Sequence, residues 1–191
     1  MPALLRSRLR LLWLLPALLL ATPVLSSPGV VASIPPLHSL VSAVMDGVGT
    51  PHLLLRGGQS PHSFSLRPSD ARLLADADLV LWIGPPLELP LQRILPTLGQ
   101  GRAVALIDAP GVQTLPLREL HEDPHEGGHT HGGPLDPHIW LSPVNAVAMV
   151  ARIAQALATV DPDNAARYRQ NAQQLTARLH ALDRELAARL A

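Results

Sequence analysis

The stretch GVVASIPPLHSLVSAVMDGV, residues 29–48, predicts a strand followed at once by a helix, and this pairing decides the fold class. Residues 29–34 form a short apolar run, which is typical of a strand buried on both faces. Beyond it, apolar side chains recur at helical spacing, at Leu37, Leu40, Val41, Val44, Met45 and Val48. A strand buried on both faces needs helices over both sides, so the stretch indicates an α/β protein.

The same alternation continues downstream. Helices are expected over 70–76 and around 87–95, and the further predicted strands are the apolar runs at 53–55, 79–83 and 103–107. Apolar strands separated by helices are typical of a parallel sheet covered on both faces. We therefore predict a lobe, residues 28–160, built on a four-stranded parallel sheet flanked by helices.

Two longer helices are predicted at the end of the chain. Ser142 and Asp161 are each followed by proline, the arrangement of an N-cap with proline at the first helical position. The last segment, residues 161–191, carries an apolar stripe at Tyr168, Ala172, Leu175, Leu179, Leu182 and Leu186. A two-stranded coiled coil would need more heptads, so we expect the stripe to pack on the lobe.

The N-terminus has the pattern of a secretory signal. Three arginines in the first ten residues precede an apolar run at 11–20 and small residues at 24–27, so residues 1–27 are predicted to be cleaved after Ser26 or Ser27. An uncleaved membrane anchor is the alternative, but a span needs about 20 predominantly apolar residues. The sequence has no cysteine, which excludes disulfides, thiolate zinc sites and a lipid-modified N-terminal cysteine. We therefore expect a free periplasmic protein.

Net charge and histidine content narrow the function further. A formal net charge of zero gives no general attraction to nucleic acid or to an acidic membrane surface. Without cysteine, a zinc site has to use the nine histidines together with carboxylates. Three of these histidines, His38, His52 and His180, are interpreted as surface residues without a ligand role.

Two histidines lie where ligand sites are expected. His62 follows the second predicted strand in a turn rich in glycine and serine, and open α/β sheets place ligands beyond the carboxyl ends of their strands. His138 immediately precedes a capped helix, and Asp136 could accept its other ring N–H, as metal-bound histidines usually require. Judged from sequence position alone, an ordinary loop role for His62 and a packing role for His138 are alternatives equal to a ligand role.

Four further histidines, His121, His125, His129 and His131, lie between acidic residues and glycines. Glycines at 127, 128, 132 and 133 disfavour a stable helix or strand, so the imidazoles are not held in a fixed geometry. Such a tract is expected to bind divalent transition metals weakly and with little selectivity. A loop that serves only solubility is the alternative.

Three blocks of the sequence resemble the zinc-specific periplasmic solute-binding proteins of high-affinity ABC transporters, the metal-binding cluster A-I or cluster 9 family. They are VVASIPPLHSLVSAVMDGV, SPHSFSLRPSDARLLADADLVLWIG and DPHIWLSPVNAVAMVARIAQALATVDPDNAARYRQNAQQL. The resemblance covers the chain beyond the signal. It implies two lobes joined by a long helix, here residues 163–190, with zinc in the cleft between them.

The family pattern implies His62 and His138 as the primary zinc ligands, Asp136 as support, and residues 118–135 as the family's histidine-rich loop. The family's third histidine and its carboxylate ligand come from a second lobe that this sequence does not contain. We therefore expect the N-terminal lobe plus linker helix of a truncated form. A genuine single-lobed protein is the alternative.

The resemblance predicts a monomeric, non-enzymatic protein that captures Zn²⁺ and delivers it to a membrane permease. Manganese or iron uptake by the sister branch is an alternative, although those metals favour more oxygen ligands. An exported zinc hydrolase is a second alternative, but no HExxH sequence is present. An adhesin-like surface module is a third, and it would need an anchor.

Overall fold

Four short parallel strands form the sheet of the computed structural model, which describes residues 27–98, 102–117 and 135–191. They are β1 (Val30–Ala32), β2 (His52–Leu53), β3 (Leu79–Trp82) and β4 (Ala103–Ala105), in the order β2-β1-β3-β4. In the register, Val31 lies opposite both His52 and Val80. The predicted four-stranded parallel sheet is confirmed, with strands shorter than the apolar runs in the sequence.

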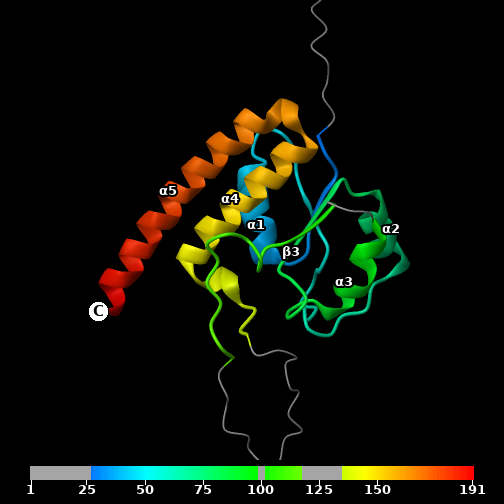
Figure 1. Ribbon diagram of the computed structural model, residues 1–191, viewed down its shortest axis with the longest axis horizontal. Helices are drawn as coiled ribbons and strands as arrows, with labels where there is room; N and C mark the ends of the chain where they lie inside the picture. The colour runs from blue at the N-terminus through cyan, green and yellow to red at the C-terminus, as the bar shows by residue number, and fades with distance from the viewer. Residues whose placement is uncertain (1–26, 99–101, 118–134) are drawn as a thin grey trace, which may run out of the picture.

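Helices cover both faces of the sheet because the chain reverses its direction of travel across it. From β1 the chain moves outward through α1 (Pro35–Val44) to β2, then returns through α2 (Pro68–Asp76) to β3 on the far side of β1. It continues through α3 (Leu89–Ile94) and the short 3₁₀ helix η1 (Leu95–Leu98) to β4. Right-handed crossovers made in opposite directions place α1 on one face and α2 and α3 on the other (Figure 1).

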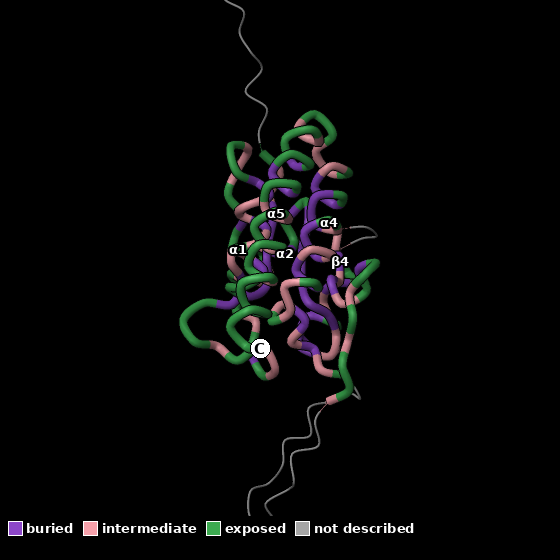
Figure 2. The backbone as a smooth tube through the Cα atoms, turned by 90° about the vertical axis from the view of Figure 1, so that its left-hand side faces the viewer, coloured by how far each residue is buried: buried purple, intermediate pink, exposed green. Residues whose placement is uncertain are grey.

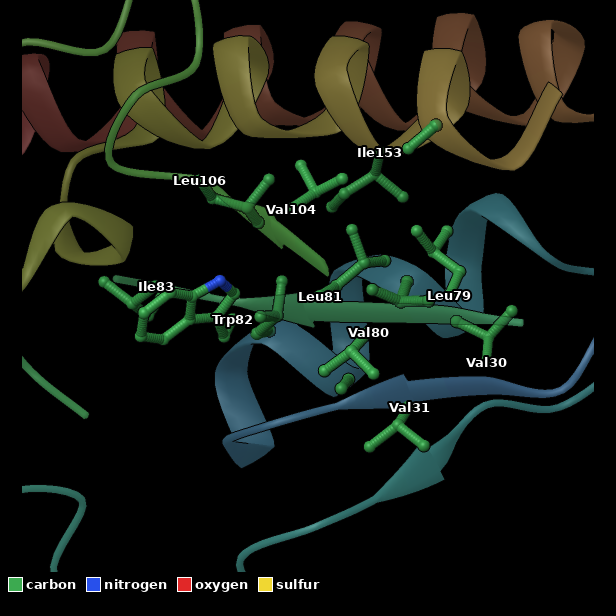
Figure 3. Close-up of a cluster of buried hydrophobic side chains, with 14 of the residues drawn as sticks. Val30, Val31, Leu79, Val80, Leu81, Trp82, Ile83, Val104, Leu106 and Ile153 are labelled. Carbon is green, nitrogen blue, oxygen red and sulfur yellow. The ribbon is translucent and has the colours of Figure 1, made fainter. Parts of the chain in front are cut away.

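The two longest helices, α4 (Pro143–Val160) and α5 (Ala165–Leu190), run antiparallel on the α1 side of the sheet (Figure 1). By length and composition alone α4 could cross a membrane. Its buried face identifies it instead as a core helix, because Ile153 is fully buried and points toward Val104 and the strands (Figure 3). Each such buried aliphatic side chain contributes about 1.5–3 kcal/mol.

Both predicted N-cap positions are confirmed, but only Ser142 caps its helix through the side chain. Ser142 Oγ accepts a hydrogen bond from the Asn145 backbone N–H at 3.4 Å. The Asp161 carboxylate makes no backbone cap and instead accepts from the Tyr168 hydroxyl at 2.6 Å. Tyr168 is fully buried, and a buried hydroxyl requires a partner. The short 3₁₀ helix η3 (Pro162–Asn164) therefore precedes α5.

The first third of α5 is fastened to the lobe, and the remainder extends beyond it. Asn171 is buried, and its side-chain nitrogen donates to the carbonyls of Val44 and Asp46 at 2.9 and 2.8 Å. Farther along, Leu182 and Leu186 remain 43% and 37% exposed. The predicted apolar stripe therefore packs only in its first part, and the turns of α5 near the C-terminus are mostly exposed (Figure 2).

A buried carboxyl group closes the turn that follows β3. Glu88 is fully buried, and its Oε2 accepts from the backbone N–H groups of Ile83 and Gly84 at 2.8 and 3.0 Å. Gly84 has φ +144°, and a Cβ there would lie 2.7 Å from the Ile107 side chain, so the turn requires glycine.

Burial raises the pKa of Glu88 to about 7, against the opposing effects of the Ser33 hydroxyl and the two N–H groups. The Ser33 hydroxyl acts by proximity, because neither Ser33 Oγ nor Glu88 Oε1 has a partner within hydrogen-bond geometry among the described residues. No sequence pattern predicts this buried carboxyl group, because a single glutamate beside a proline-rich turn is typical of a surface residue.

Glu88 should make folding stability depend on pH. Its pKa is higher folded than unfolded, so the folded state binds the extra proton between about pH 4.5 and 7 and stability falls as pH rises through that window. Glu88→Gln removes this titration. The free energy of unfolding of the variant relative to the wild type should therefore rise by about 3 kcal/mol from pH 5 to pH 8, measured by urea denaturation.

Because the free energy of unfolding is compared at two pH values, any effect of the new amide that does not depend on pH cancels. Glu185→Gln, at an exposed position on α5, is the matched control and should show no such change. If the free energy of unfolding of Glu88→Gln relative to the wild type stays constant from about pH 5 to pH 8, the raised pKa of Glu88 is wrong.

Candidate metal centre

His62 and His138 meet at the carboxyl edge of the sheet, although they lie far apart in the sequence. His62 belongs to the loop that follows β2, and His138 directly precedes the 3₁₀ helix η2 (Ile139–Leu141), which leads into α4. Their ring centroids are 5.6 Å apart, with the ring planes inclined at 59°. Parallel strands put all their following loops at one edge, and that topology brings the two imidazoles together.

The separation of the two rings fits a shared metal ion. A zinc ion bound tetrahedrally to two imidazole nitrogens at about 2.0–2.1 Å holds the ring centroids about 5 Å apart. The observed 5.6 Å is therefore close to the geometry of a pair of ligands. Both residues are only half-buried, so a metal ion and its remaining ligands can approach from solvent.

His138 is oriented by Asp136. One carboxylate oxygen of Asp136 accepts from the His138 ring Nδ1–H at 2.6 Å and from its backbone N–H at 3.0 Å. An ionised carboxylate can only accept, so the proton lies on Nδ1 and Nε2 is left as the metal-binding nitrogen. The backbone N–H first, and then the ring N–H, lower the pKa of Asp136, which favours the ionised carboxylate. Trp140 supports the opposite part of the imidazole, edge-on at 5.2 Å.

The other histidines lie elsewhere. His52 and His180 are exposed, as predicted. The surface interpretation of His38 is wrong: its ring is half-buried, Nε2–H donates to the Pro51 carbonyl at 3.0 Å, and Nδ1 lies 3.4 Å from the Ser42 hydroxyl. The helical period of α1 concealed this role, because Pro51 is reached only after the chain turns back.

The candidate centre contains two imidazoles and one supporting carboxylate. Within residues 27–98, 102–117 and 135–191, no group of three or more His, Cys, Asp or Glu side chains is placed to hold a metal ion. The histidine-rich tract, with His121, His125, His129 and His131, lies outside the described residues, as does the predicted signal up to residue 26.

An open hollow of about 380 Å³ lies beside His138, and its lining includes Gln113, Leu115, Asp136 and Asn145. Neither Gln113 nor Asn145 belongs to a motif that predicts a site. A signal was nevertheless present, since Asn145 is a polar residue at a position of α4 where the helical period calls for an apolar one.

Comparisons with known proteins identify the family. The family described as zinc-uptake complex component A, periplasmic, matches residues 30–191. The high-affinity zinc uptake system protein ZnuA of Brucella abortus is 40% identical over 196 residues, which cover 85% of this chain and 58% of that protein. The chain thus spans a little over half the length of the curated relatives it matches.

Solved structures share the fold. The Zn(II)-bound ZnuA-like domain of Streptococcus pneumoniae AdcA superposes with a TM-score of 0.68 at 24% identity, over 83% of this chain and 54% of that one. A Mn-bound periplasmic metal binding protein from Candidatus Liberibacter asiaticus gives a TM-score of 0.66 at 25% identity, over 80% and 53%.

Replacing Asp136 tests how His138 is held. Asp136→Asn removes the charge and allows the amide to present an N–H to the ring, which favours the wrong tautomer. Zinc affinity at the centre should fall about 10–100-fold, as is usual when the partner of a metal-bound histidine is lost. Isothermal titration with zinc measures the effect.

Asp163→Asn is the control, because Asp163 lies in η3 beyond the far end of α4, about 27 Å of helix away from Ser142. Equal zinc affinities for the wild type and Asp136→Asn would show that the carboxylate does not support a ligand.

Proposed function

The chain belongs to the family of zinc-uptake complex component A periplasmic proteins, and on that basis we propose that it captures Zn²⁺ in the periplasm for delivery to the permease of an ABC transporter. The observation that carries the proposal is the pair of imidazoles, His62 and His138, 5.6 Å apart at the carboxyl edge of the sheet. Residues 1–27 act as the export signal in this proposal.

The nitrogen donors that this part of the chain supplies are suited to reversible binding of zinc. His62 and His138 provide neutral nitrogen ligands, which zinc accepts in tetrahedral sites. The remaining donors of the tetrahedron come from outside the described residues. Division of the ligands between separate parts of a protein allows the site to open and release the ion without breaking the fold of either part.

The histidine-rich tract has a separate role in this proposal. His121, His125, His129 and His131 collect zinc weakly and raise its concentration close to the centre. Pro116 and Leu135, the described residues that flank the tract in the sequence, form an antiparallel bridge.

Zinc titration of the chain with labelled histidine rings tests both roles. The ring signals of His62 and His138 should shift together with one common dissociation constant, because both bind the same ion. His138→Ala should abolish the shift of His62, whereas His180→Ala, at an exposed position on α5, should leave it unchanged.

Deleting residues 122–133 should remove additional weak zinc binding, measured by calorimetry, and leave the common constant of His62 and His138 unaltered. The proposed division of roles would be overturned if the two rings shifted with different dissociation constants. It would also be overturned if deletion of the tract removed the response of both rings to zinc.

Manganese is the second candidate cargo, because one structural relative is described as Mn-bound. Manganese favours oxygen ligands, while both described donors are nitrogens, so we expect zinc to be the natural cargo. Protein purified from the periplasm of its own cells without added metal should carry zinc in excess of manganese, measured by elemental analysis. Manganese in excess would move the chain to the sister branch of transporters.

A further inference from the structure

Asn145 makes an unusual pair of hydrogen bonds in the first turn of α4. Its side chain is buried, Oδ1 accepts from the Gln113 backbone N–H at 2.8 Å, and Nδ2 donates to the Gln113 carbonyl at 2.9 Å. One amide thus satisfies both backbone groups of a residue 32 positions away, as a neighbouring strand would. The segment after β4 is fastened to α4 at this point.

Further contacts connect the segment that Asn145 holds to His138, the candidate ligand. The Leu115 carbonyl accepts from the Asp136 backbone N–H at 2.8 Å, and Pro116 is bridged to Leu135. Asp136 in turn accepts from both the backbone and the ring of His138. Asn145 is therefore connected to the imidazole through its hydrogen bonds to Gln113, the covalent backbone from Gln113 to Leu115, and the hydrogen bonds made by Asp136.

Packing does little to hold this segment in place. Gln113 is exposed, Leu115 is 68% exposed, and the open hollow lies between them and the first turn of α4. Where apolar contacts are few, the hydrogen bonds to a buried side chain determine the position of the backbone. Loss of the Asn145 amide would free the backbone at Gln113 and Leu115, and with it the carbonyl that holds Asp136.

We propose that Asn145 is a positioning residue for zinc binding, which fixes the orientation of His138 through Gln113, Leu115 and Asp136 without contacting the metal ion. The inference rests on the proposed role of His138 as a zinc ligand. Asn145 then sets how well the second imidazole is preorganised before zinc arrives, and preorganisation contributes directly to affinity.

The test compares two buried asparagines. Asn145→Ala removes both bonds to Gln113, while Asn171→Ala removes two bonds of similar length to the carbonyls of Val44 and Asp46. Asn171, on α5, bonds at the C-terminal end of α1, which lies at the edge of the sheet opposite the candidate centre, so it controls for a general loss of stability. Both variants are made in the full chain, and their unfolding is measured with urea.

The first readout is the tautomer of His138 without metal, from nitrogen and proton signals of its ring. Wild type and Asn171→Ala should show the proton on Nδ1, and Asn145→Ala should show a mixture. The second readout is the zinc dissociation constant reported by the His138 ring during titration with zinc sulfate. It should rise about tenfold or more in Asn145→Ala and stay within about twofold in Asn171→Ala.

An unchanged tautomer together with an unchanged dissociation constant in Asn145→Ala would overturn the inference, as would an equal loss of affinity in Asn171→Ala. If the wild-type His138 ring does not respond to zinc, the proposed function fails, and the metal-free tautomer still decides the positioning role of Asn145. Should Asn145→Ala not fold, Asn145→Ser, which keeps a polar side chain but cannot make both bonds, is judged by the same two readouts.

Discussion

The parallel pairing of four strands is the constraint on which the rest of the structure depends. Parallel strands need crossover connections, and right-handed crossovers made in both directions from β1 cover the sheet on both faces. The same connections send every loop that follows a strand to one edge. His62 and His138 come from loops after the two outermost strands, β2 and β4, and they meet because both loops turn inward over that edge.

Polar side chains on the lobe hold backbone where apolar packing ends. Glu88 closes the turn after β3, Asn145 holds the segment after β4, and Asn171 fastens α5 to the end of α1. Each is buried and bonds to two backbone groups, so each polar side chain finds hydrogen-bond partners in the backbone that it holds. Glu88 lies in the chain between β3 and the candidate centre, and Asn145 lies in the first turn of α4, shortly after His138.

The candidate centre combines one strongly held ligand with an open approach. Asp136 fixes the tautomer of His138, and Trp140 supports its ring, while both imidazoles remain partly exposed. A site of this kind can bind an ion in a defined geometry and still release it, because the surrounding protein does not enclose it. The long, partly exposed helix α5 leads away from the lobe on the same side as α1 and α4.

The sequence by itself determined the fold class, the order of the elements, the N-cap at Ser142 and the candidate residues His62, His138 and Asp136. These features follow from local periods, from capping chemistry and from a spacing of two residues, all of which act over short distances along the chain. The sequence could not show that the Asp161 side chain accepts from the Tyr168 hydroxyl, or that His38 binds the Pro51 carbonyl. Only the tertiary structure decided the separation of the two imidazoles, the burial of Glu88 and the pairing of Asn145 with Gln113, because each depends on segments brought together by the crossovers of the sheet.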